Sequence, residues 1–174
     1  MKRIEITEAG RDDRAVIEDM FQSYADDFTA FVDSIPRTED GRYLMPDGTP
    51  TLDSYFSSAD QHALLVTDSD RSVGFVLLDR QCLMDPASLV VAHFYISQEW
   101  RGKGVGTLAA AQVFDMFPGP WEVAVMQENL SAIRFWQAAI SRYTRDSFRR
   151  LEPDGWSGPV FVFDNSGHPG GKEL

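Results

Sequence analysis

The sequence predicts a mixed α/β fold: a central six- to seven-stranded sheet, mostly antiparallel with one parallel pair, flanked by about four helices. Three observations support this class. The chain has 174 residues, of which 43% are hydrophobic, enough for one domain with its own core. The predicted elements follow the order β-α-(α)-β-β-β-α-β-α-β-β. The β-α-β unit at 89–126 requires a parallel pair, whereas tight turns between the other strands favour antiparallel neighbours.

The first third of the chain reads as a strand, a helix and a polar turn region. Alternation over KRIEIT, 2–7, predicts a strand. Residues 11–28 predict an amphipathic helix. Two Asp-Gly pairs, at 40–41 and 47–48, predict turns, and 52–59 predict a short helix. The residues expected on one face of the first helix are Ile17, Met20, Phe21, Tyr24 and Phe28.

The rest of the chain predicts two hairpins around the β-α-β unit. Residues 62–81 read as two strands joined by the turn DSDRS. The β-α-β unit combines a strand at 88–97, a helix at 106–117 and a strand at 121–126. A helix at 128–140 follows, and then strands at 143–150 and 159–164. We expect a single domain over 1–164 and a flexible tail over 165–174.

Composition narrows the class of function. The net charge of −11 argues against broad nucleic-acid binding, which needs a basic surface. The acidity fits a cationic substrate such as an amine, or it serves only solubility. No apolar run approaches the roughly 20 residues that span a bilayer. The N-terminal residues lack a secretory apolar segment, so we expect a cytoplasmic protein that does not enter membranes.

Cysteine and histidine usage gives no sign of a metal site or a disulfide. The single cysteine, Cys82, has no partner in the chain and no activating base nearby in the sequence. The histidines His62, His93 and His168 are isolated from one another. We therefore expect no metal.

The stretch HFYISQEWRGKGVG, 93–106, combines a strand with a basic, glycine-rich loop that enters a helix. Gly102, Gly104 and Gly106 let the backbone approach a ligand, and a helix N-terminus attracts anions. Arg101 and Lys103 add positive charge, so the stretch predicts a phosphate site. The spacing matches neither a P-loop nor GxGxxG, and a turn that binds no ligand is the alternative.

Two motifs at a fixed separation give this chain a resemblance to the GNAT superfamily of N-acetyltransferases, in particular to little-characterised bacterial predicted acetyltransferases. The first is [QR]-x-x-G-x-[GA], often preceded by an aromatic residue, and the second is N-x-x-A-x-x-[FL]-Y. The resemblance rests on motifs over about 88–140 and on the order of the elements over 1–87. The matching residues are Trp100, Arg101, Gly104, Gly106, Asn129, Ala132 and Phe135; Trp136 stands in place of the tyrosine.

The resemblance implies the GNAT fold, in which acetyl-CoA occupies a V-shaped split between the splayed fourth and fifth strands. Backbone groups of one strand segment would pair with the pantetheine arm, and main-chain amides of the glycine loop would hold the pyrophosphate. Asn129 would contact the pantetheine or the adjacent backbone. The strand residues are Phe94, Tyr95 and Ile96, and the loop residues are Arg101, Gly102, Lys103, Gly104, Val105, Gly106 and Thr107.

The implied reaction is direct acetyl transfer to a primary amine of a small molecule or peptide within a ternary complex. His93 stands where the family often has an acid and is the candidate base; a structural histidine is the alternative. An indole is no proton source at neutral pH, so Trp136 cannot replace the family's tyrosine and is expected to pack against the sheet. Tyr24 and Tyr143 are further candidates to reach the cleft.

Other functions stay open at this point. The missing tyrosine motivates a CoA-binding module without acetyl transfer, and the β-α-β unit motivates a nicotinamide-dependent enzyme. The family often forms homodimers, but the sequence identifies no face for one. The stretch 23–43 would govern the acceptor; its acids would attract an amine or merely face solvent. These acids are Asp26, Asp27, Asp33, Glu39 and Asp40.

Overall fold

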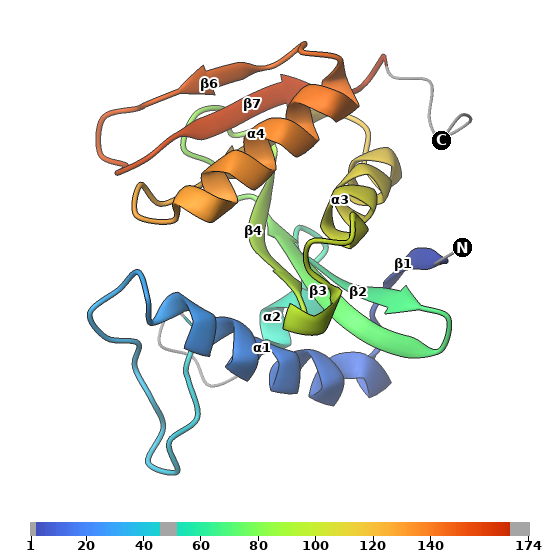
Figure 1. Cartoon of the computed structure of the whole chain (residues 1–174), viewed down its shortest axis with the longest axis vertical. Helices are drawn as coiled ribbons and strands as arrows, with labels where there is room; N and C mark the ends of the chain where they lie inside the picture. The colour runs from blue at the N-terminus through green and yellow to red at the C-terminus, as the bar shows by residue number, and fades with distance from the viewer. Residues whose placement is uncertain (1–2, 46–51, 168–174) are drawn as a thin grey trace.

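The computed structural model describes residues 3–45 and 52–167, which form one seven-stranded sheet (Figure 1). The strands lie in the order β1-β2-β3-β4-β5-β7-β6, and the β4–β5 pair alone is parallel among the described strands. This arrangement confirms the predicted fold class. The strands are β1 (Ile4–Glu8), β2 (His62–Asp68), β3 (Arg71–Asp79), β4 (Leu89–Ile96), β5 (Pro120–Ala124), β6 (Arg149–Leu151) and β7 (Val160–Asp164).

Helices cover both faces of the sheet. In Figure 1, α1 and α2 lie on one face, and α3 and α4 lie on the other. Two short 3₁₀ turns precede α1 and α3. The helical elements are η1 (Arg11–Asp13), α1 (Arg14–Phe28), α2 (Asp53–Ser57), η2 (Gln98–Trp100), α3 (Val105–Met116) and α4 (Leu130–Thr144).

The central strand β3 explains why two cores form. Successive side chains of a strand point to opposite faces, and β3 is apolar at both sets of positions. Phe75 and Leu77 enter the core under α1 and α2, while Val76 and Leu78 enter the core under α3 and α4. All four are fully buried, as a strand covered on both faces requires.

The parallel pair β4–β5 is short, and the two strands then separate. Its paired positions are Leu89 with Trp121 and Val90 with Glu122. Beyond them β4 stays paired with β3 as far as Ile96. This divergence confirms the predicted splayed pair. It leaves one edge of β4 facing a gap instead of a neighbouring strand.

The predicted strand at 143–150 is wrong over its first six residues. Helix α4 continues to Thr144, and β6 begins only at Arg149. The reason is packing: Tyr143 lies three residues after the buried Ile140, on the same helix face. Its hydroxyl donates to Asp115 at 2.8 Å, which fixes the last turn of the helix.

The chain beyond β7 begins with a fixed residue, not with the flexible tail expected from 165. Asn165 is buried; its side chain accepts from the Gly119 N–H at 2.7 Å and donates to the Phe114 carbonyl at 2.7 Å. It thereby holds the end of α3 to the start of β5. The rest of the predicted tail from 168, with His168, and the Asp-Gly pair at 47–48 lie outside the described residues.

A buried carboxylate organises the loop before β4. Glu122 of β5 is 1% exposed, and its oxygens accept from three consecutive main-chain N–H groups. The donors are Leu83 at 2.8 Å, Met84 at 3.1 Å and Asp85 at 2.6 Å. Cys82 of the same loop donates its thiol to the Ser88 carbonyl, and burial raises the pKa of that thiol. The raised pKa favours the protonated thiol over the reactive thiolate.

Replacing Glu122 with glutamine should lower the free energy of unfolding by about 2–3 kcal/mol, because an amide nitrogen would then face buried N–H donors. Urea denaturation measures the change. Glu128→Gln, on an exposed glutamate six residues later, should stay within about 0.5 kcal/mol of the unmodified chain. Equal stability of the two variants would contradict a structural role for the buried carboxylate.

Candidate active site

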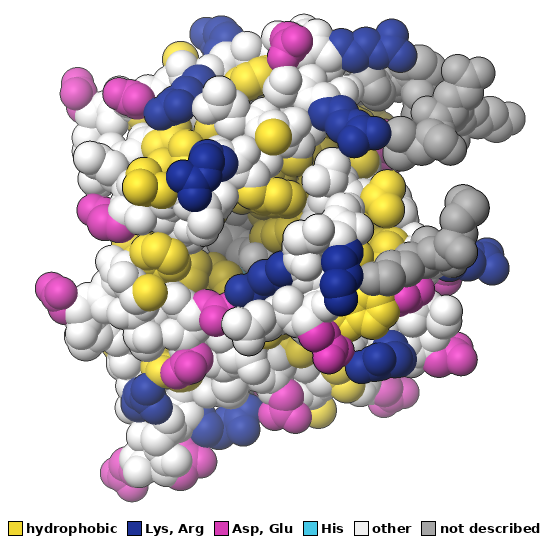
Figure 2. All heavy atoms as spheres, in the orientation of Figure 1, with side chains coloured by type: hydrophobic (Ala, Val, Ile, Leu, Met, Phe, Trp, Pro, Cys, Tyr) yellow, Lys and Arg dark blue, Asp and Glu magenta, His cyan; other side chains and the backbone are white. Residues whose placement is uncertain are grey.

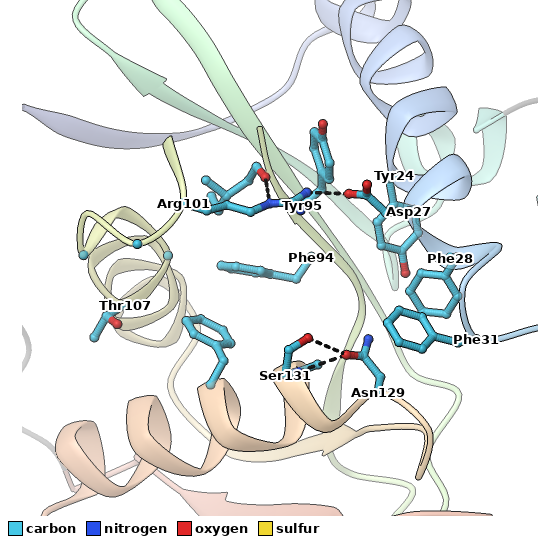
Figure 3. Close-up of a pocket in the computed structure, with 16 residues that line it drawn as sticks. Tyr24, Asp27, Phe28, Phe31, Phe94, Tyr95, Arg101, Thr107, Asn129 and Ser131 are labelled. Carbon is cyan, nitrogen blue, oxygen red and sulfur yellow. Dashed lines mark hydrogen bonds and ion pairs between the residues drawn. The ribbon is translucent and has the colours of Figure 1, made fainter. Parts of the chain in front are cut away.

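A cleft of about 690 Å³ opens where β4 and β5 diverge. Helix α1, the β4 edge, the glycine loop and the first turn of α4 form its walls. In the space-filling view the surface is hollowed between α1 and α4, with hydrophobic side chains around the hollow (Figure 2). The close-up shows the glycine loop with Arg101 and Thr107 at one end, and Phe28 and Phe31 at the other (Figure 3).

Glycine is required in the loop for two different structural reasons. Gly102 and Gly104 adopt positive φ angles of 69° and 80°, and Gly104 is the N-cap of α3. A Cβ at either position would meet nothing within 4 Å, so the main chain there borders open space. A Cβ at Gly106 would lie 3.1 Å from the Phe135 ring, so this glycine permits close packing of α3 on α4. Gly104, Gly106 and Thr107 line the cleft, so the N-terminus of α3 borders it.

The cations of the loop take separate positions. Arg101 reaches across the cleft: its Nε donates to the Ile96 carbonyl at 2.7 Å, and its Nη2 contacts Asp27 Oδ2 at 2.5 Å. Its guanidinium also lies 5.3 Å from the centroid of the Tyr95 ring. Lys103 instead donates to the Glu99 carbonyl, outside the cleft.

The β4 edge lines the cleft at all three predicted positions. Phe94 packs toward α4, with its ring centroid 4.9 Å from that of Trp136 and 5.6 Å from that of Phe135. Tyr95 belongs to the opposite core, beneath α1. The Ile96 carbonyl points into the cleft, because it accepts from Arg101. Trp136 is 7% exposed and fills the core, as expected.

The remaining predicted residues differ in whether their side chains line the cleft, cap a helix or pack in the core. Asn129 lines the cleft and caps α4: its Oδ1 accepts from the Ala132 N–H and from the Ser131 hydroxyl, both at 3.0 Å. Thr107 lines the cleft through the first turn of α3. Val105 is 1% exposed, so its side chain belongs to the core and only its main chain borders the loop.

The structure places His93 behind Tyr24 instead of on the cleft wall. His93 Nδ1 lies 3.1 Å from the Tyr24 hydroxyl, and Phe21 packs edge-on against the imidazole. Tyr24 lines the cleft, and burial raises the pKa of its hydroxyl. Tyr143, the other candidate of the sequence, bonds Asp115 away from the cleft. The sequence left these two tyrosines undecided, and tertiary packing selects Tyr24.

Sequence reasoning missed two aromatic residues of the site. Phe28 was expected on the buried face of the first helix, and Phe31 was not singled out. Both are half-buried and line the cleft. The available signal was their spacing after Tyr24, at four and seven residues, which continues one helix face past the core.

The acids of 23–43 are mostly surface groups. Asp27 lines the cleft and pairs with Arg101, while Asp26 accepts from the Tyr43 hydroxyl. Asp33 and Glu39 are exposed. The alternative that these acids merely face solvent is therefore correct for Asp33 and Glu39. Of the five acids, only Asp27 lines the cleft.

Neither a metal cluster nor a membrane helix occurs in the described part of the chain. Within 3–45 and 52–167, no group of three or more His, Cys, Asp or Glu side chains could hold a metal ion. Over the same residues, no helix has the length and apolar character needed to cross a bilayer.

Comparison with known proteins matches both the fold and the motifs. The family model described as the Acetyltransferase (GNAT) family matches residues 17–139. No curated protein sequence matches the chain.

Solved structures with a similar fold are distant in sequence. An acetyltransferase from Thermus thermophilus is 16% identical with a TM-score of 0.69, covering 94% of this chain and 99% of that one. The aminoglycoside acetyltransferase AAC(6')-Ib in complex with coenzyme A is 13% identical with a TM-score of 0.64, covering 93% and 95%. NAA60 of Arabidopsis thaliana, with a bisubstrate analogue, is 14% identical with a TM-score of 0.58, covering 93% and 98%.

The cap of α4 is open to a direct stability test. Asn129→Ala removes the side-chain acceptor for the Ala132 N–H and should lower the free energy of unfolding by about 1 kcal/mol. For a chain of this size that corresponds to about 2–4 °C in the melting temperature, measured by circular dichroism. Leu130→Ala, at the adjacent 60% exposed position, is the control and should melt with the unmodified chain. An unchanged melt of Asn129→Ala would refute the cap.

Proposed function

The chain belongs to the GNAT acetyltransferase family, and on that premise we propose that it transfers the acetyl group of acetyl-CoA directly to a primary amine. One observation carries the proposal: the amides at the start of α3 and the unpartnered edge of β4 border the same cleft. An anion held at the helix end and an extended arm on the strand edge therefore converge on one space. Both substrates would meet there in a ternary complex.

The residues of the loop fit the diphosphate of coenzyme A. The absence of a Cβ at Gly102 and Gly104 leaves open space over the N-terminus of α3, where partial positive charge attracts phosphate. Arg101 lines the cleft at the same end, where its guanidinium pairs with Asp27. When bound, acetyl-CoA would supply the acetyl group as an activated thioester.

The β4 edge fits a peptide-like arm. Backbone groups at Phe94 and Ile96 alternate away from β3, so an extended ligand can pair with them as an added strand would. Arg101 already donates to the Ile96 carbonyl, so we propose that the arm shares this edge with the guanidinium. Asn129 and Ser131 would border the arm from the α4 side.

We assign proton removal from the amine to Tyr24 and His93 acting together. Tyr24 lines the cleft, and its hydroxyl lies 3.1 Å from His93 Nδ1. Burial raises the pKa of Tyr24, so a free phenolate is unfavourable. The amine proton would therefore pass to the tyrosine oxygen as the tyrosine proton passes to His93, which must be neutral to accept it.

A CoA-binding module without acetyl transfer is the second candidate. The buried Trp136 favours it, because an indole supplies no proton to a leaving thiolate. The sheet does not support a nicotinamide-dependent enzyme. Dinucleotide-binding folds have a mostly parallel sheet, whereas five of the six strand pairings among the described residues are antiparallel. Thiol release from acetyl-CoA, measured against a panel of primary amines, tests transfer; tight CoA binding with no turnover on any amine would support the module instead.

Gly104→Glu should weaken acetyl-CoA binding by about 100-fold, or 2.7 kcal/mol, because a carboxylate would occupy the space proposed for the diphosphate. Isothermal calorimetry measures the affinity. The matched control is Gly104→Ala, which adds the backbone strain of a φ of 80° without charge. It should cost about 1 kcal/mol of stability and leave the affinity within a few-fold. Normal affinity in a cooperatively folded Gly104→Glu variant would refute the loop assignment.

His93→Asn and Tyr24→Phe should each lower kcat by about 100-fold while acetyl-CoA affinity stays unchanged. The double variant should lose little more than either single variant, because the pair acts as a unit.

The control for this pair is His62→Asn, a histidine of β2 that contacts Glu8 and Phe117 and does not line the cleft. It should retain full kcat. Full activity of His93→Asn, or losses that simply multiply in the double variant, would show that the two side chains do not share a proton.

A further inference from the structure

Three aromatic side chains form one wall of the cleft opposite the glycine loop. We call Tyr24, Phe28 and Phe31 the aromatic wall. Ring centroids are 4.9 Å apart between Tyr24 and Phe28, and 5.9 Å apart between Phe28 and Phe31. Their spacing of four and three residues stacks them on the side of α1 and its final turn that faces the cleft.

The outer members of the aromatic wall do not serve the core. The buried ridge of α1 is Ile17, Phe21 and Ala25, at 0%, 4% and 2% exposure. Phe28 and Phe31 lie beyond this ridge, are half-buried and pack into neither of the two cores. Large apolar side chains left open to a cavity are characteristic of ligand sites.

The surfaces that face the aromatic wall are also largely apolar. Phe94, Ala132 and Phe135 line the cleft from β4 and α4. Asn129 and Ser131 supply polar atoms at the near end of α4, across from Phe28 and Phe31 (Figure 3). A ligand held here would meet rings on its flanks and a few polar groups near the centre.

The charge of the cleft is balanced in spite of the net charge of −11. Among the described residues that line it, Asp27 is the only acid, and Arg101 contacts it at 2.5 Å. A polycation needs several carboxylates to replace its hydration, and this lining offers a single paired one. The cleft therefore disfavours polyamines and aminoglycosides as ligands.

The position of the aromatic wall assigns it to the acceptor. The cofactor's diphosphate and arm would occupy the loop and the β4 edge, so the α1 end remains for the second substrate. The whole cleft is about 690 Å³, so the part of the acceptor that enters beside the cofactor would be small.

We propose that the acceptor is a small primary amine carrying an aromatic or branched aliphatic group within two or three carbons of its nitrogen. The apolar group lies against Phe28 and Phe31, and the nitrogen lies near the Tyr24 hydroxyl. This inference rests on the proposed acetyl transfer, of which it names the substrate class.

The test compares kcat/KM for thiol release with five acceptors on the full chain. These are 2-phenylethylamine, ethanolamine, spermidine, an aminoglycoside and a tetrapeptide beginning with phenylalanine. We expect 2-phenylethylamine to exceed each of the others at least tenfold, because its ring alone can be buried at the aromatic wall without stranding a charge.

The variant Phe31→Ser tests whether the aromatic wall causes the preference for 2-phenylethylamine. It should raise the KM for 2-phenylethylamine about tenfold and leave kcat and acetyl-CoA affinity unchanged, because a ring contact is lost far from the reacting atoms. The KM for ethanolamine should not change. Val16→Ser, at an exposed apolar position on the same helix but outside the cleft, is the control and should leave every constant unchanged.

Higher kcat/KM for spermidine or the aminoglycoside would overturn the acceptor class and leave acetyl transfer standing. A preference for the tetrapeptide would assign the wall to a peptide's first residue and overturn the small-molecule acceptor. If no amine releases thiol, transfer itself fails. Calorimetry would then measure the binding of 2-phenylethylamine to the CoA complex. Binding that Phe31→Ser weakens would support the acceptor site, and absence of binding would refute the acceptor site.

Discussion

The divergence of β4 from β5 is the constraint on which the rest of the structure depends. Parallel pairing ends after Val90 and Glu122, while β4 remains hydrogen-bonded to β3. Glu122, the last residue of β5 that pairs with β4, is also the buried carboxylate that accepts from three amides of the loop leading into β4. One side chain thus anchors both strands just before they separate. Phe94 and Trp136 then fill the base of the gap with apolar surface, so the opening above them stays a cleft and does not collapse.

Helix α1 completes the site through two contacts that contribute more to orientation than to stability. Arg101 and Asp27 are 43% and 47% exposed, and exposed ion pairs contribute about 0–1 kcal/mol. Their contact nevertheless joins the glycine loop to the last turn of α1. The Tyr24–His93 hydrogen bond joins the same helix to β4. Together the two contacts position α1 relative to the glycine loop and β4. Apolar burial of the α1 ridge supplies the stability that these polar contacts do not.

Local sequence patterns predicted the site better where a single segment builds it. The glycine loop and the β4 edge each lie within one short stretch, and their geometry follows from glycine and strand rules. The predictions failed where an apolar pattern is ambiguous. Tyr143 suits a strand by type, yet it continues the buried face of α4 and bonds Asp115. Asn165 looked like the start of a tail because the partners of its side chain lie 22, 46 and 51 residues earlier.

The sequence by itself determined the class of the fold, the order of its elements, the two motifs and the helix entrance suited to a diphosphate. These are properties of periodicity and of residue type at fixed spacing. Only the tertiary structure decided that Tyr24 stands between His93 and the cleft, that Arg101 pairs with Asp27, and that Phe28 and Phe31 line the cleft instead of the core. The first two contacts join residues 69 and 74 positions apart. No local pattern encodes such a distance, because it depends on how whole helices and strands pack.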